Sequence, residues 1–169
     1  GVQSCALPIY AKKNVGYIEG KNNSNIFAFT AGHPNHQPWC ATFIVACFKV
    51  GQEGKAIKNS ASCIEIEQWA NAHKRAIPVA EAQAGDLLLF DFSRSGKSEH
   101  IGLATSSYNS KTKTIRTIEG NTSSGRGSQT NGDGVYNKVR GNSAIRMAIR
   151  RSEEHTSELQ SRGLISYAV

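Results

Sequence analysis

Residues 39–50 read WCATFIVACFKV, and this stretch decides the fold. It is apolar on nearly every side, so it predicts a helix that is buried all round rather than one with a single apolar stripe. Pro38 directly precedes it, at a position where a missing backbone N–H costs little. Residues 62–75 carry apolar side chains at helical spacing and predict a second helix facing the same core. Before the buried helix, residues 11–17 resemble the last turns of a helix, and residues 20–38, rich in Asn, Gly and Pro, predict a long ordered loop.

The second half of the chain has a different pattern. Short runs of alternating or continuous apolar residues are separated by clusters of Gly, Asn, Ser and Asp that favour turns. The strands expected from these runs are residues 86–92, 101–106, 114–119, 135–140 and 144–149. Helices followed by a meander of strands indicate an α+β domain, with the N-terminal helices packed on a small antiparallel sheet.

Both ends of the chain resemble translated sequencing-adapter DNA. Residues 151–161 (RSEEHTSELQS) and 165–169 (ISYAV) follow one adapter in a single frame, and residues 1–9 (GVQSCALPI) follow the opposite adapter with Ser4 as the one departure. We therefore expect residues 1–9 and 151–169 to be adapter-derived and the native domain to be residues 10–150. A signal peptide, a membrane segment or a wall-binding domain can lie outside such a piece. The alternative is a native, charged helical tail.

The chain is basic, with 20 Lys and Arg against 13 Asp and Glu and a net charge of +7. A basic surface suits an anionic polymer, either nucleic acid or a cell wall that bears teichoic acid, but it also serves solubility alone. Of the four cysteines, Cys5 falls in the adapter-like segment. The other three, Cys40, Cys47 and Cys63, match neither a disulfide framework nor a CxxC zinc pattern, and they favour one reactive thiol among buried ones.

Cys40 stands in the first turn of the predicted buried helix, where free N–H groups and the helix dipole should lower the pKa of its thiol. A thiolate nucleophile needs a base and a group that orients the base. If the strands at 101–106 and 114–119 form a hairpin, His100 falls opposite Glu119 to Asn121. Glu119 and Asn121 are two residues apart and are expected to share a face. Spacing alone leaves the alternative that Cys40 is a core residue and His100 a structural one.

A set of short motifs resembles a known family. They occur in the order PWCATFIV at 38–45, GDLLLFDF at 85–92, EHIGLAT at 99–105, TIEGNTS at 117–123 and NGDGVYNKVR at 131–140, and YIEGKNNSNIFAF at 17–29 resembles the approach to the nucleophile. Together they resemble the CHAP domain, the cysteine- and histidine-dependent amidohydrolase/peptidase family of phage lysins, which belongs to the papain-like NlpC-type group. The resemblance covers nearly all of residues 10–150.

The resemblance implies a papain-like CHAP/NlpC-type fold and a thiol mechanism. Cys40 would be the nucleophile and His100 the general base, with Glu119 orienting His100 and Asn121 supporting the imidazole or polarising the site. The tetrahedral oxyanion would be held by backbone N–H groups at the helix start. Gln37 is a candidate oxyanion donor and Trp39 a candidate floor of the substrate cleft, although a surface polar role for Gln37 and a core role for Trp39 stay open.

Metal and cofactor chemistry is not expected. His33, His36 and Cys40 have a spacing that imitates a zinc site, but Pro34 and Pro38 break any helix that would place them on one face. Residues 21–39 contain no Asp or Glu for a calcium site. We therefore expect no metal and no cofactor, and we expect Cys47 and Cys63 to serve packing.

The function that the resemblance implies is peptidoglycan hydrolysis, by an endopeptidase or an N-acetylmuramoyl-L-alanine amidase, in a phage endolysin or a bacterial autolysin. The partner would be bacterial peptidoglycan, with anionic wall polymers as additional partners, and the protein would act at the cell wall after secretion or phage lysis. We expect a monomer with no membrane contact. The alternatives are a papain-like amidase with another substrate, and a non-catalytic basic module that binds cell wall or nucleic acid.

Overall fold

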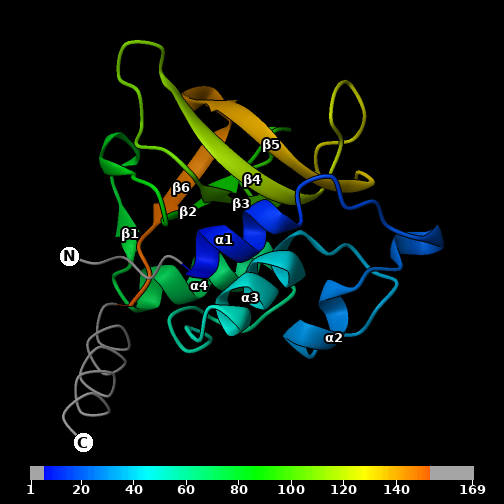
Figure 1. Cartoon of the computed structure of the whole chain (residues 1–169). Helices are drawn as coiled ribbons and strands as arrows, with labels where there is room; N and C mark the ends of the chain where they lie inside the picture. The colour runs from blue at the N-terminus through cyan, green and yellow to red at the C-terminus, as the bar shows by residue number, and fades with distance from the viewer. Residues whose placement is uncertain (1–5, 153–169) are drawn as a thin grey trace, which may run out of the picture.

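Helices occupy the first half of the chain and strands the second, as Figure 1 shows for residues 6–152, the part that this computed structural model describes. The helices are α1 (Ala6–Lys13), α2 (Phe27–Ala31), α3 (Cys40–Val50) and α4 (Cys63–Ala72), with short 3-10 turns η1 (Lys21–Asn23), η2 (Val79–Glu81) and η3 (Asn142–Ala144). The strands are β1 (Ala76–Ile77), β2 (Leu87–Phe90), β3 (His100–Ala104), β4 (Thr114–Thr122), β5 (Gly134–Gly141) and β6 (Ile145–Ile149). The expectation of an α+β domain with an antiparallel sheet is confirmed.

The strands form one antiparallel sheet in the order β1-β6-β2-β3-β4-β5. Strands β2 to β5 follow one another as a meander, as expected, but β6 crosses back and pairs with β2 on the other side. Strand β1, which the sequence did not predict, covers the outer side of β6. Its two residues are too few to give a period-2 pattern, so only the pairing with β6 defines it.

Helix α3 lies at the centre, and nine of its residues, Cys40 to Phe48, are buried. An all-round apolar helix must be covered on every side, and here α1 and α2 pack on it together with β3 and β4. The prediction that residues 20–38 form only a loop is wrong for α2. The side chain of Asn25 accepts hydrogen bonds from the backbone N–H of Phe27 and Ala28 (3.1 and 3.0 Å) and so starts this short helix.

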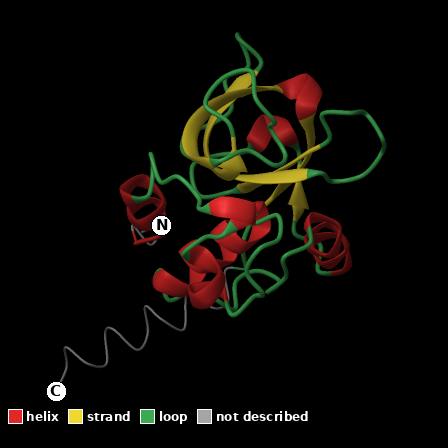
Figure 2. Cartoon of the chain, turned by 90° about the vertical axis from the view of Figure 1, so that its right-hand side faces the viewer, coloured by secondary structure: helices red, strands yellow, loops and turns green. Residues whose placement is uncertain are grey.

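The sheet has apolar residues on both faces. Leu87, Leu89 and Leu103 belong to the core shared with the helices, whereas Leu88 and Phe90 belong to a second cluster on the opposite face. Figure 2 shows the strands curving round, and Val79 of η2 and Ala144 of η3 pack against this second cluster. Because both faces of β2 are covered, its sequence LLLF is a continuous apolar run rather than an alternating one.

The predicted boundary at residue 9 falls inside α1, whereas the one at residue 151 follows the end of β6 at Ile149. Residues 6–9 form the first half of α1, and Leu7 is fully buried in the core. Near the other end, Arg151 pairs with the buried carboxylate of Glu53 at 3.0 Å. The remaining adapter-like residues, 1–5 and 153–169, lie outside the described part. Within residues 6–152, the helices are all too short or too polar to cross a bilayer.

Candidate active site

Cys40 is the first residue of α3, and its side chain is 5% exposed. The residue before it, Trp39, is the N-cap residue of the helix, and its side chain makes no capping hydrogen bond. The backbone N–H groups of the first turn have no partners inside a helix, so they present partial positive charge at the Cys40 thiol. This is a position that favours a thiolate.

His100 begins β3 and is fully buried. Its Nε2 lies 2.9 Å from a carboxylate oxygen of Glu119 on β4. Its other ring nitrogen, Nδ1, is buried with no hydrogen-bond partner in residues 6–152, which leaves it available to the neighbouring Cys40 thiol. The hairpin expected from the sequence accounts for this arrangement, because Leu103 pairs with Ile118 and the register brings the start of β3 to the end of β4.

Arg140 on β5 is the second partner of Glu119. Its guanidinium donates to both carboxylate oxygens, with an Nε–Oε1 distance of 2.9 Å and an Nη2–Oε2 distance of 2.5 Å. The same guanidinium lies over the ring of Phe92, 4.8 Å from the ring centroid. Burial would raise the pKa of Glu119, but the hydrogen bonds and charges of Arg140 and His100 outweigh it and lower the pKa to about 2. Glu119 is therefore a fixed anion beside His100 at every pH at which the protein would work.

Cys40 and His100 change each other's protonation. Burial alone would lower the pKa of His100, but its contacts with the Cys40 thiol and the Glu119 carboxylate raise it to about 9. The pKa of Cys40 is well below its usual value, because a hydrogen bond from Cys63 and the interaction with His100 outweigh the cost of burial, with a smaller contribution from the Ala41 backbone N–H. Both shifts favour a thiolate on Cys40 and an imidazolium on His100. The lowered pKa expected for Cys40 is confirmed in direction, but the helix start is not its main cause.

Cys63, like Arg140, was not identified from the sequence as part of this site. It is the first residue of α4, and its sulfur lies 3.7 Å from the sulfur of Cys40. Its own pKa is well above the usual value, because of its hydrogen bond to Cys40, burial and the negative charge of Cys40. Cys63 therefore stays protonated and donates to the Cys40 thiolate. It was expected to serve packing alone, and no spacing rule links residues 40 and 63, since only the packing of two helix starts brings them together.

In this structure the side chain of Asn121 hydrogen-bonds the start of α3 rather than the His100 imidazole. Its side-chain oxygen accepts from the backbone N–H of Trp39 at 2.9 Å, and its amide donates to the backbone carbonyl of Gly132 at 2.9 Å. The β4–β5 register shifts between Glu119 and Thr122, and Asn121 has a φ of 55°. This bulge breaks the strand alternation on which the shared face of Glu119 and Asn121 depended. Asn121 instead ties the start of α3, and with it Cys40, to the end of β4.

Two glycines allow the strands to approach closely enough for these contacts. A Cβ on Gly120 would lie 2.7 Å from side-chain atoms of Trp39 and Phe43, so β4 could not rest on α3 with any larger residue. A Cβ on Gly102 would lie 2.7 Å from Cγ of Glu119. The glycine at 102 leaves the space through which the Glu119 side chain reaches His100.

The two candidate substrate-binding residues differ in position. Trp39 is fully buried, stacks on Phe27 with ring centroids 5.4 Å apart, and hydrogen-bonds Glu19 through its indole N–H. It is a core residue in this structure and offers no surface to a substrate. Gln37 is half-buried, three residues before Cys40, and its side chain makes no hydrogen bond to the described residues. The role of Gln37 as an oxyanion donor stays a prediction.

The histidines upstream of Cys40 are held by other contacts. His33 lies 2.9 Å from the hydroxyl of Thr42 and 2.6 Å from the side-chain oxygen of Asn59, and His36 lies 3.1 Å from the backbone carbonyl of Asn22. Their hydrogen bonds tie the loop before α3 to its surroundings. The zinc alternative therefore gains nothing from the structure.

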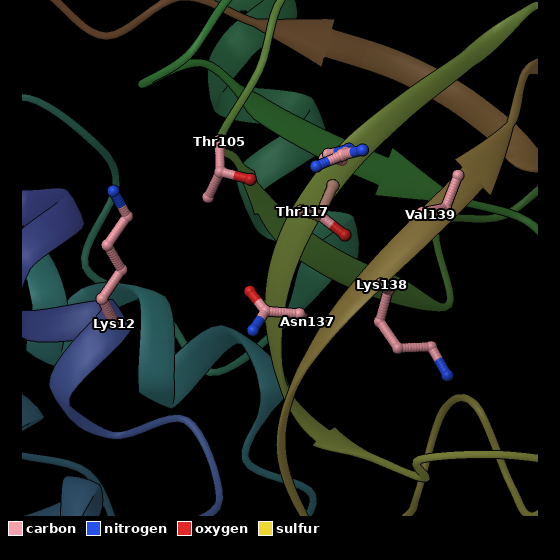
Figure 3. Close-up of a pocket in the computed structure, with 7 residues that line it drawn as sticks. Lys12, Thr105, Thr117, Asn137, Lys138 and Val139 are labelled. Carbon is pink, nitrogen blue, oxygen red and sulfur yellow. The ribbon is translucent and has the colours of Figure 1, made fainter.

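A separate shallow pocket of about 480 Å³ lies between α1 and strands β3 to β5 (Figure 3). Its lining is basic and polar, and consists of Lys12, Thr105, Arg116, Thr117, Asn137, Lys138 and Val139. In Figure 3 the side chain of Lys138 runs away from Lys12, and its amine donates to the backbone carbonyl of Ser123 at 2.7 Å. Because these cations do not converge and none of the residues around Cys40 lines the pocket, we assign no chemistry to it.

Comparison with the models of known protein families and with curated proteins returned no match. The site is therefore defined by the geometry of its side chains and by the sequence motifs in which these residues occur.

Proposed function

We propose that the protein is a cysteine-dependent amide hydrolase with a papain-like CHAP/NlpC-type fold, and that its substrate is bacterial peptidoglycan. The observation that carries the proposal is the buried set of Cys40, His100 and Glu119. A thiolate, an imidazolium and a carboxylate held in series are the groups that nucleophilic amide hydrolysis requires. The motifs around these residues are those that resemble the CHAP family.

The chemistry follows from the positions of the groups. The Cys40 thiolate attacks the carbonyl carbon of the amide, and the free N–H groups at the start of α3 stabilise the oxyanion that forms. His100 gives its Nδ1 proton to the leaving amine, which departs and leaves a thioester on Cys40. Neutral His100 then takes a proton from water as the water attacks the thioester. Glu119 stays ionised throughout and stabilises the imidazolium.

Peptidoglycan as substrate is supported by the motif resemblance and by the charge of the chain. A net charge of +7 favours approach to a wall that carries anionic polymers. In this proposal the enzyme acts at the cell wall as an endopeptidase or an N-acetylmuramoyl-L-alanine amidase. Mass analysis of the released muropeptides distinguishes the two bonds.

The test is turbidity clearing of Gram-positive cell walls by the full chain and by two variants. Cys40→Ala should lose clearing by at least roughly a thousandfold, because the nucleophile is removed. Cys47→Ala is the matched control, since Cys47 is a buried cysteine of the same helix outside the set around His100. It should keep clearing activity as long as the protein remains folded.

Equal clearing by Cys40→Ala and the unchanged chain would refute the thiol mechanism. Loss of clearing in every form, together with retention on walls or DNA that salt abolishes, would favour a basic binding module instead. Release of peptide from a small amide substrate without wall clearing would favour a papain-like amidase with another substrate.

A further inference from the structure

The thiol pair formed by Cys40 and Cys63 has a geometry that the hydrolytic mechanism does not use. The two sulfurs are 3.7 Å apart, and each residue is the first of its helix, α3 and α4 respectively. A disulfide bond is about 2.05 Å long, so closing this pair needs sulfur movements of the size that a side-chain rotation supplies. In residues 6–152 all three cysteines, Cys40, Cys47 and Cys63, are reduced.

We propose that Cys63 is a resolving cysteine, and that peroxide converts the site into a Cys40–Cys63 disulfide that is inactive and can be reduced again. This inference rests on the proposed role of Cys40 as the nucleophile. In this inference, formation of a disulfide between Cys63 and Cys40 regulates the activity of the same site.

The first step is oxidation of Cys40. Its thiolate attacks one oxygen of hydrogen peroxide, the O–O bond breaks, and the leaving hydroxide takes a proton from the His100 imidazolium to become water. Cys40 is then a sulfenic acid, two electrons more oxidised. A thiolate reacts in this way and a protonated thiol does not, so Cys40 is the cysteine that peroxide selects. Cys47, fully buried and with its pKa raised by burial, is not.

The second step is resolution by Cys63. Oxidation removes the negative charge of Cys40, which is one of the causes that raise the pKa of Cys63. Cys63 then loses its proton more readily, and its sulfur attacks the sulfur of the sulfenic acid. The hydroxyl of Cys40 leaves with the proton of Cys63 as water, and the S–S bond forms. The disulfide removes the nucleophile while protecting it from irreversible oxidation to the sulfinic acid.

The experiment treats the full chain with hydrogen peroxide in a Cys5→Ser background, so that only the three cysteines of the described part remain. Peptide mapping follows after digestion with chymotrypsin, whose cleavage after Phe43 separates Cys40 from Cys47. We expect one cross-linked product, Cys40 to Cys63, loss of wall clearing, and recovery of clearing with dithiothreitol. Each variant is compared with its own untreated activity.

Cys63→Ser is the decisive variant, because it keeps a donor beside Cys40 but cannot form a disulfide. It should show Cys40 sulfinic acid after peroxide and no recovery with dithiothreitol. Cys47→Ser is the matched control and should behave as the parent does. Absence of the Cys40–Cys63 peptide, or equal recovery in Cys63→Ser, would overturn the inference. If the disulfide forms but the reduced protein does not clear cell walls, the resolving role of Cys63 is supported and the proposed hydrolytic function is refuted.

Discussion

At the residue scale, the site depends on the balance between burial and paired charge. His100 and Glu119 are both fully buried, a condition that disfavours ions. Arg140 offsets this cost on one side of Glu119, and the Cys40 thiolate offsets it beyond His100. The result is a chain of alternating charges in which each group stabilises its neighbour. Cys63 extends the chain by one neutral donor.

This balance predicts a bell-shaped dependence of activity on pH. The working form has ionised Cys40 and protonated His100, so activity should rise as the pH passes the lowered pKa of Cys40. It should fall as the pH rises through about 9, where His100 loses its proton. The two limits belong to the pair rather than to either residue. Iodoacetamide alkylation of Cys40 needs only the thiolate and checks the acid limit, and wall clearing measured across the whole range checks both limits.

Glu119→Gln should shift the alkaline limit to lower pH, because the carboxylate that raises the pKa of His100 is lost. Glu99→Gln is the matched control. It removes the same charge one residue from His100, but Glu99 hydrogen-bonds Ser93 and Ser95 in the neighbouring turn. An alkaline limit that moves equally in both variants would show that the direct His100–Glu119 contact does not set it.

At the element scale, the position of Cys40 depends on how closely α3 and β4 approach. The approach is fixed by Gly120, which leaves no room for a side chain against Trp39 and Phe43, and by Asn121, which holds the Trp39 N–H at 2.9 Å. A bulge at the end of β4 turns Asn121 toward the helix. Strand and helix are therefore joined at the point where the nucleophile stands.

Gly120→Ala tests this junction. The added methyl group has no space, so the variant should lose about 1–3 kcal/mol of unfolding free energy and alkylate more slowly at Cys40. Gly125→Ala is the control, because a Cβ there meets nothing within 4 Å. Its stability should change by less than about 0.5 kcal/mol. Urea unfolding midpoints measure both, and equal midpoints for the two variants would contradict the close packing of α3 on β4.

At the scale of the whole molecule, one core joins the helices to the inner face of the sheet. It reaches from Leu7 on α1 through α3 to Ile149 on β6. Helix α1 is thus part of the folded domain in this structure, although residues 1–9 resemble adapter sequence. A domain that began at residue 10 would lack Leu7 and its contribution to that core.

Leu7→Ala should therefore lower the free energy of unfolding by about 2–5 kcal/mol, the cost of emptying a buried leucine site. Ile9→Ala, on the same helix but with Ile9 49% exposed, should change it by less than about 0.5 kcal/mol. Unfolding in urea followed by circular dichroism compares them. A Leu7→Ala variant as stable as the unchanged chain would show that α1 is not docked in solution.

The sequence by itself determined much of the fold. Residues 39–50 are so uniformly apolar that they had to be a buried helix, and the short apolar runs between turn residues located five of the six strands. The pairing of His100 with Glu119 followed from hairpin register, since antiparallel strands joined by a turn can be counted along the chain. These features can be predicted because they depend on the spacing of apolar residues within one element and on strands that follow each other directly in the chain.

Tertiary structure alone decided the rest. The return of β6 to β2, the bidentate contact of Arg140 with Glu119 and the approach of Cys63 to Cys40 all join residues that are far apart in the chain. No periodic pattern encodes such contacts, because they depend on how whole elements pack. The bulge at Asn121 broke a rule that holds for regular strands, so its partner became Trp39 and not His100. The sequence determined which elements form, and the packing of those elements decided which side chains meet.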